Sequence, residues 1–456
     1  MPFQPVILLT DAFIFLLLIM AGFLVWHVRR HEHLLEAWRQ VGQRKVAMSA
    51  AVVLLFYVVI GVLDSMHFRP LAENADNKIQ YDTKVLSVLD LALTQLREQK
   101  EKTYSAPFAT HLYSKETIET LSGTQRDYPR LVYGGAHLGG DESVAADVLV
   151  TLIKSAALGV ALTAFLYLLV YRFSARERWS QRGVGSHQVV WLTLTVLMSS
   201  LVALLWLSQN YHGLGTDKVG EDVLYQAIKS IRTGVVIGSL TTLVMLPAAI
   251  ILGLMAGYFR GWVDDVIQYL YTTLSSVPGV LLIAAAVLMM QVYMSNNQAE
   301  FNTVLERSDM RLFFLCLILG ITSWTGLCRL LRGETLKLGQ LEYVQAAKAF
   351  GVGDWRILLR HITPNVMHIV LIVIVLDFSG LVLAEAVLSY INIGVDPSTH
   401  SWGNMINSAR LELAREPVVW WSLLGAFVFM FILVLAANLL ADAVRDAFDP
   451  RLKDQS

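Results

Sequence analysis

Nine long apolar stretches constrain the fold of this 456-residue chain more than any other feature. A helix of about 20 apolar residues crosses a bilayer with all its backbone polar groups satisfied internally. Hydrophobic residues make up 55% of the chain and charged residues 16%, which excludes an ordinary soluble globule. The sequence predicts an all-α polytopic membrane protein with about nine transmembrane helices. The predicted spans cover residues 5–27, 46–65, 146–171, 189–208, 231–258, 266–292, 311–332, 366–390 and 418–443.

Basic residues predict the orientation of these spans. Five lie in the loop 28–45 and four in the loop 172–188, and cytoplasmic loops are enriched in lysine and arginine. Counting spans from these loops places residues 333–365 and the C-terminus in the cytoplasm and the N-terminus outside. The first span has no basic leader before it and is followed by Arg29 and Arg30, so we expect it to remain as a span rather than to be cleaved as a signal peptide.

The largest segment between spans, residues 66–148, is predicted to lie outside the cytoplasm. Apolar residues from Val85 to Leu96 predict an amphipathic helix, which the charged run Arg97–Lys102 follows. A segment of this length is more than a linker. Two interpretations remain open: a cap over the outer ends of the helices, and a docking surface for a solute-binding partner.

A polar segment between two apolar runs predicts a contact with another protein. It extends from Glu342 to Pro364, and its sequence predicts a helix, a turn and a second helix on the cytoplasmic side. Gly351 supplies the bend at little steric cost, Asp354 is expected to cap the second helix, and Pro364 is expected to close the element before the next span.

The chain carries none of the sequence motifs expected of an enzyme. It has no G-x-x-x-x-G-K-[ST] phosphate loop, so we do not expect it to hydrolyse ATP by itself. No pattern predicts a metal site or a catalytic nucleophile, and Cys316 and Cys328 are expected to be packing residues in one apolar run.

Three residues inside the spans are candidates for a transport pathway or gate. Charged residues in hydrocarbon are costly and tend to face a bundle interior or a cavity. For Asp377 a pathway role and a buried hydrogen bond to a neighbouring helix are equally open, while Glu385 is favoured as a structural residue near the outer end of its span. Pro278 is expected to kink its helix in mid-membrane, with or without contact to a substrate.

From about residue 212 onward the chain resembles the permease subunits of bacterial ATP-binding cassette (ABC) importers of the dipeptide, oligopeptide and nickel type. Motifs that match this family's patterns in order are His212–Val223 (H-P-x-G-T-D-x-x-G-R-D-V), Gly257–Asp264 (G-Y-x-G-G-x-x-D), Glu342–Pro364 (the E-A-A loop), Ala384–Gly394 with Ser401–Met405, and the tail Arg445–Arg451. The chain departs from these patterns where Gln345 replaces a usual glutamate, Glu221 a common arginine and Gly213 a common proline.

The resemblance implies a permease core of the type I ABC-importer class, with about six helices and no cofactor of its own. The implied regions are N-terminal spans at 1–65, an extracytoplasmic insertion at 66–148, an added transmembrane pair at 149–211 and the core at 212–456. The loop 333–365 would couple the core to ATPase subunits. The residues of this coupling loop are Glu342, Gln345, Ala346, Ala347, Phe350, Gly351, Asp354, Trp355, His361 and Pro364.

The partners implied are a second permease subunit, one or two cytoplasmic P-loop ATPase subunits that bind ATP and Mg²⁺, and an extracytoplasmic solute-binding protein, all at a bacterial inner membrane. No nucleic-acid partner is expected. An ATP-independent channel or secondary transporter is the alternative function, and a membrane receptor or assembly factor built on the outer segment is another. The sequence leaves open the solute, the role of the N-terminal additions and whether the two permeases are identical.

Overall fold

A computed structural model of the chain describes residues 3–71, 81–82, 84–120, 123–139, 143–173, 184–297 and 303–448. Contacts divide the chain into two compact units. Unit 1 comprises Met1–Ile7, Gly42–Gly234 and Thr399–Ala436, and unit 2 comprises Leu8–Val41, Val235–Ser398 and Ala437–Ser456. Most of the basic loop 172–188 and the end of the tail motif, residues 449–451, lie outside the described residues.

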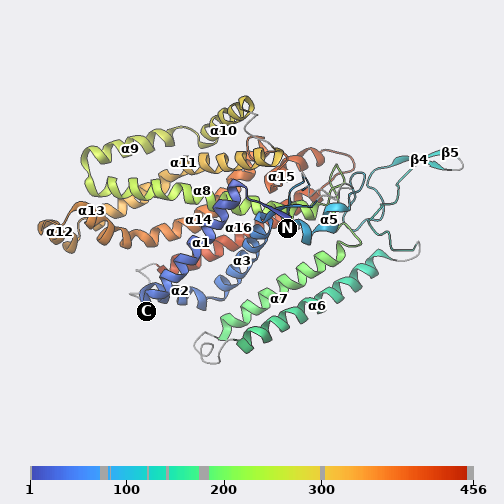
Figure 1. Ribbon diagram of the computed structural model, residues 1–456, viewed down its shortest axis with the longest axis horizontal. Helices are drawn as coiled ribbons and strands as arrows, with labels where there is room; N and C mark the ends of the chain where they lie inside the picture. The colour runs from blue at the N-terminus through green and yellow to red at the C-terminus, as the bar shows by residue number, and fades with distance from the viewer. Residues whose placement is uncertain are drawn as a thin grey trace. The chain divides into compact units, whose positions relative to one another are not determined.

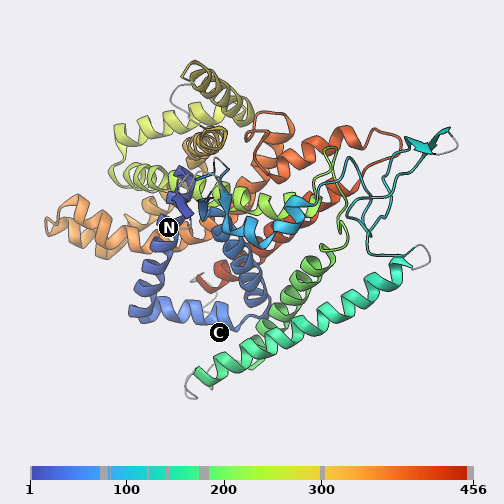
Figure 2. The ribbon, with the colours of Figure 1, turned by 45° about the vertical axis from the view of Figure 1, so that its right-hand side comes forward.

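Unit 1 contains long apolar helices and two small antiparallel sheets. Its sheets have the orders β1-β2-β3 and β4-β5, and α6 and α7 lie side by side in both views (Figure 1, Figure 2). Its elements are β1 (Phe3–Val6), α3 (Lys45–Ser65), β2 (His67–Pro70), β3 (Leu86–Ser87), α4 (Val88–Ala92), α5 (Thr94–Glu98), β4 (Glu116–Thr120), β5 (Gly123–Asp127), α6 (Val144–Phe173), α7 (Val184–Leu207), the start of α8 (Val223–Phe259), α15 (Trp402–Glu412) and most of α16 (Trp421–Phe448).

The regular elements of unit 2 among its described residues are all helices. Its elements are α1 (Leu9–Arg30), α2 (Glu32–Gln43), the remainder of α8, α9 (Gly261–Ser276), α10 (Gly279–Asn296), α11 (Val304–Leu338), α12 (Glu342–Ala349), α13 (Asp354–Ile357), the π-helical turn η2 (Leu358–Ile362), α14 (Thr363–Tyr390) and the end of α16. Helices α8 and α11 approach closely, because a Cβ at Gly257 would lie only 2.6 Å from Cβ of Thr335.

The predicted fold class is confirmed. Nine helices among the described residues are long and apolar enough to cross a membrane. Eight of them overlap a predicted span along most of its length. The exception is 266–292, which is not one helix: α9 ends at Ser276, and α10 starts at Gly279 after the extended Val277 and the non-helical Pro278. Proline therefore breaks this helix, where only a kink was predicted.

The insertion differs from its prediction in local structure. The expected helix from Val85 to Leu96 is instead the short strand β3 followed by α4 and α5, which are separated at Leu93. Ser87 caps α4: its Oγ accepts from the backbone N–H of Asp90, and Asp90 accepts in return from the N–H of Ser87. The apolar pattern predicted one helix from Val85. The helix starts later because the side chain of Ser87 accepts from a backbone N–H and so caps a helix that begins at Val88.

The insertion is joined to the segment that precedes α8 by a buried cluster of charges. His212 Nδ1 lies 2.8 Å from Asp222 Oδ2, and its Nε2 lies 3.6 Å from Glu101 Oε1. Glu101 also accepts from the backbone N–H groups of Val132, Tyr133 and Gly134. This cluster connects residues 66–148 to the part of the chain that carries the motif His212–Val223.

The electrostatics of this cluster favour its charged form. Burial opposes charge on His212, but hydrogen bonding to Asp222 and the nearby Glu101 carboxylate outweigh it and raise the pKa of His212 to about 9. Burial likewise opposes ionisation of Glu101, yet its contacts with His212 and the three backbone N–H groups lower its pKa to about 2. At neutral pH, one buried cation therefore lies between two carboxylates.

Candidate functional site

The polar segment between α11 and α14 begins with the short helix α12, which ends at a glycine turn. Val352 N–H donates to Ala347 C=O and Gly351 N–H to Lys348 C=O, the pattern of a Schellman motif. Gly351 has a φ of +74°, in the left-handed region that favours glycine. The bend predicted at Gly351 is therefore present.

The second half of the segment differs from its prediction in two ways. Gly353 caps α13 and Asp354 is its first helical residue, so Asp354 is not the cap. Pro364 does not close the element either, because α13, η2 and α14 run on as one helical stretch, Asp354–Tyr390. The π-helical turn precedes the proline, and Thr363 donates through both its N–H and its Oγ1 to Leu358 C=O. A wider helical turn accommodates a residue that lacks an N–H.

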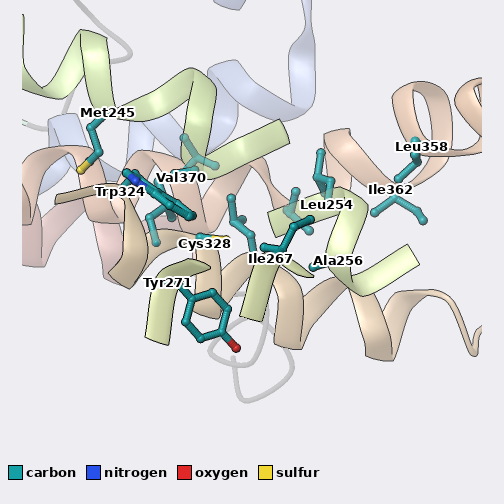
Figure 3. Packing of buried hydrophobic residues seen from close by; sticks show 14 of the residues in the cluster. Met245, Leu254, Ala256, Ile267, Tyr271, Trp324, Cys328, Leu358, Ile362 and Val370 are labelled. Atoms are coloured by element: carbon teal, nitrogen blue, oxygen red, sulfur yellow. The ribbon is translucent and has the colours of Figure 1, made fainter. Parts of the chain in front are cut away.

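Buried apolar residues fix this segment to the rest of unit 2. Val344 of α12, Ile357 of α13, and Leu358 and Ile362 of η2 are buried in one cluster with residues of α8, α9 and α11. Figure 3 shows Leu358 and Ile362 near Leu254 of α8. Since each half of the segment contributes to one close-packed core, α12 and α13 are held as a rigid element.

The opposite side of the segment exposes large apolar side chains. Phe350 is 88% exposed, Leu359 68% and Trp355 60%. Lys348, Arg356 and Arg360 are exposed beside them. Glu342, Gln345, Ala346 and Pro364 are exposed as well, whereas Ala347 and His361 are half-buried. Such a mixture of aromatic and basic side chains is typical of a surface that binds another protein.

The turn between α8 and α9 contacts the same segment, which the sequence analysis did not include in the site. Tyr258 OH donates to Asp354 Oδ1 at 2.7 Å, and the rings of Phe259 and Trp355 lie 5.8 Å apart, edge to face. When the side-chain amide of Gln340 is oriented with its oxygen toward Arg260, Arg260 Nη2 donates a hydrogen bond to that oxygen at 2.6 Å. The contacting residues of this turn belong to the motif Gly257–Asp264, whose sequence pattern does not by itself predict a contact with the segment.

Arg260 adopts an unusual backbone conformation in this turn. Its φ is 55° and its ψ −167°, a combination that is normally confined to glycine. The pattern that this turn resembles has glycine at this position. In this conformation the guanidinium of Arg260 contacts Gln340, which lies shortly before α12. The contact links the turn between α8 and α9 to the turn between α11 and α12.

Two further hydrogen bonds attach α12 to its neighbours. Gln345 Nε2 donates to Gly339 C=O at 2.6 Å, at the end of α11, and Asn365 Nδ2 donates to Tyr343 OH at 3.1 Å, at the start of α14. The first bond needs the amide, since a carboxylate cannot donate. Glutamine at 345 in place of the usual glutamate therefore has a defined structural role in this chain.

The three pathway candidates lie at different places in the fold: Asp377 and Glu385 on α14, and Pro278 before α10. Glu385 is buried and accepts from Ser389 Oγ at 2.7 Å, while Pro278 precedes α10 in the exposed break. Asp377 is half-buried, and across the described residues it has no hydrogen bond or ion pair. The hydrogen bond that one interpretation of Asp377 required is thus not found in this part of the chain.

The nine apolar helices among the described residues define the class of this chain: it is a polytopic membrane protein with an exposed aromatic surface on the polar segment. Residues 249–454 match the family model described as the binding-protein-dependent transport system inner membrane component. The chain is 33% identical over 242 residues to the glutathione transport system permease protein GsiD of Pectobacterium atrosepticum, an alignment that covers 53% of this chain and 73% of that protein.

Two further relatives are also named as permease proteins of transport systems. The oligopeptide transport system permease protein OppC of Mycobacterium tuberculosis (strain H37Rv) is 32% identical over 52% of this chain and 76% of its own length. The dipeptide transport system permease protein DppC of Bacillus subtilis is 28% identical over 53% and 69%. The chain belongs to the family of binding-protein-dependent transport system inner membrane components, and it is a permease subunit of an ABC importer. The resemblance noted from its motifs is confirmed.

Proposed function

We propose that this chain forms half of the translocation pathway of an ATP-driven importer of peptides or similar small solutes, together with a second permease subunit that is a different chain. The cargo class is supported by the relatives, whose names specify glutathione, oligopeptide and dipeptide transport. An extracytoplasmic solute-binding protein would deliver the solute, as the family description indicates. The chain itself would have no ATPase site, and ATP and Mg²⁺ would be bound by partner subunits.

The proposal assigns coupling to the segment from Glu342 to Pro364. The observation that carries it is a helix–turn–helix segment, α12 to α13, with a buried inner side and an exposed outer side that contains Phe350 and Trp355. A helix of this kind can seat in a groove on an ATPase subunit, where aromatic side chains supply most of the binding energy. Because α12 is packed against α8 and joined to α14, movement of the ATPase subunit would be transmitted to both spans.

In this proposal the segment 333–365 and the C-terminus are cytoplasmic, and the N-terminus and residues 66–148 are outside. The distribution of arginine and lysine between loops supports this orientation. Asp377, Glu385 and Pro278 remain candidates for the pathway or its gate. The lack of a hydrogen-bond partner for Asp377 among the described residues favours the pathway role for that residue.

The test is purification of the complex from its native membrane in mild detergent, with mass spectrometry of the bound subunits. Phe350→Asp is expected to abolish recovery of the ATPase subunits, because it places a charge in the centre of the proposed interface. Leu411→Asp on α15 is the matched control, since Leu411 is also exposed, at 69%, but lies outside the segment. A chain that purifies alone and transports without ATP would show a channel or secondary carrier instead.

A further inference from the structure

Helix α9 presents three different sides. One side is buried against α11: Asp264 forms a two-point ion pair with Arg332, at 2.6 and 2.7 Å, and the guanidinium of Arg329 lies 4.8 Å from the ring of Tyr271. Ile267 and Tyr271 belong to the same apolar cluster as Trp324 and Cys328 (Figure 3). Helix α9 therefore lies along a candidate membrane span and is not a free surface helix.

The exposed part of α9 divides into an apolar side and a polar stripe. Val266 and Leu270 form the apolar side. At 100° per residue, the polar stripe covers an arc of about 140° of the helix surface. It lines a shallow hollow of about 470 Å³ that is open to the surroundings, together with the exposed ring of Tyr269, and its members, all on α9, are Asp265, Gln268, Thr272, Thr273 and Ser276.

Helix α10, which follows the break, has no such stripe among its most exposed residues. Leu281, Met289 and Val292 are all apolar, with Met289 75% exposed, as expected of a helix in contact with lipid. The polar stripe ends at Ser276, directly before the exposed, non-helical residues Val277 and Pro278. Hydrocarbon penalises exposed hydroxyl, amide and carboxyl groups and unpaired backbone, so these groups belong beside water or protein.

We propose that the polar stripe of α9 lines the translocation pathway and contacts the transported solute. This inference rests on the proposed function and adds a substrate-contacting surface to it. Hydroxyl and amide groups both donate and accept hydrogen bonds, which matches the amide groups of a peptide, and Asp265 can pair with an ammonium group. The class of ligand is a neutral or zwitterionic solute rich in hydrogen-bonding groups.

The pathway and a partner permease are the two possible neighbours of this stripe, and its composition favours the pathway. A protein interface has a dry, close-packed apolar centre, whereas five of the six residues that line this hollow carry a hydroxyl, amide or carboxyl group and no ring, and Tyr269 is the sixth. The apolar side of α9, with Val266 and Leu270, is the side suited to lipid or to a second permease.

The experiment is cysteine labelling in the complete transporter, reconstituted in proteoliposomes. The two native cysteines, Cys316 and Cys328, are first replaced by alanine. Single cysteines are then placed at Thr272 and Ser276 in the stripe, and at Leu281 and Met289 as controls on α10. We expect a charged, membrane-impermeant methanethiosulfonate to label the stripe about tenfold faster than the controls, because only a hydrated thiol ionises and reacts readily.

A second measurement concerns the solute. Attachment of the reagent at Thr272→Cys is expected to block ATP-driven uptake of tri-alanine, while attachment at Leu281→Cys leaves it unchanged. Equal labelling rates at all four positions would overturn the inference. So would stripe cysteines that react only when the chain is purified alone, since a partner permease would then cover them. Failure of the ATPase subunits to co-purify would count against the proposed function, and the labelling pattern still decides the inference.

Discussion

Replacement of Gly351 by alanine tests the turn between α12 and α13, on which the proposed coupling role depends. Its φ of +74° is unfavourable for any residue with a Cβ, and a Cβ built there has no other atom within 4 Å. The substitution is therefore free of steric clash, and its cost is the backbone conformation alone, about 1–2 kcal/mol. That free energy corresponds to a roughly 5- to 30-fold increase in the equilibrium constant for local opening of the turn.

Hydrogen exchange followed by mass spectrometry measures this opening directly. The amides of Gly351 and Val352, which donate to the end of α12, should exchange faster in Gly351→Ala by that factor. Gly351→Asn is the matched variant, since asparagine adopts left-handed conformations at much lower cost. Its exchange should stay within about twofold of the natural sequence, because a few tenths of a kcal/mol change an equilibrium constant by no more than that.

The functional consequence follows from the same equilibrium. If the ATPase subunits bind only the closed turn, Gly351→Ala should weaken their co-purification more than Gly351→Asn does. Equal exchange rates in the alanine and asparagine variants would refute the reasoning. They would mean that the left-handed turn contributes nothing to the conformation of α12.

Three further predictions concern contacts described above. Tyr258→Phe and Asp354→Asn each disrupt the hydrogen bond between these two residues, so each should weaken binding of the ATPase subunits. The double variant should bind no more weakly than either single variant, and a double-mutant cycle of ATPase-subunit affinity should give a coupling energy of about 0.5–1.5 kcal/mol. Because the pKa of His212 is raised to about 9, its contribution to the free energy of unfolding should be complete below about pH 6.5 and should be lost as the pH rises through 9. Thermal unfolding measured against pH should detect this loss, and the pH dependence should be absent in His212→Gln. Gly220→Ala should lower the unfolding temperature sharply while Gly213→Ala does not, since a Cβ at 220 would lie 1.8 Å from Glu101 C=O and one at 213 meets nothing within 4 Å.

Much of the fold could be predicted from the sequence, because membrane spans and glycine turns depend on local composition. The number of spans follows from hydrophobicity, and the bend at Gly351 follows from the conformational freedom of glycine. The break at Pro278 was harder to predict. Proline in a membrane helix either kinks or ends it, depending on which neighbours satisfy the freed backbone groups, and these are distant in sequence.

The site was predicted less completely for the same reason. The pairing of Tyr258 with Asp354 joins residues 96 positions apart, and no periodicity indicates such a contact. The π-helical turn before Pro364 is likewise invisible in a hydrophobic pattern, as is the amide bond from Gln345 to Gly339. The helix, turn and second helix of the polar segment could be predicted from the sequence, whereas its contact with the turn between α8 and α9 could not.

The charged cluster around His212 limits how this permease can be shortened. A chain trimmed to the family-like core would lose Glu101 and leave His212 and Asp222 at a newly uncovered surface. The backbone at Gly220, which accepts the N–H of Glu101, would lose its partner as well. The segment that contains Glu101 is thus part of the same folded unit as His212 and Asp222 rather than a detachable appendage, and truncation boundaries for crystallisation or display should keep residues 101 and 222 together.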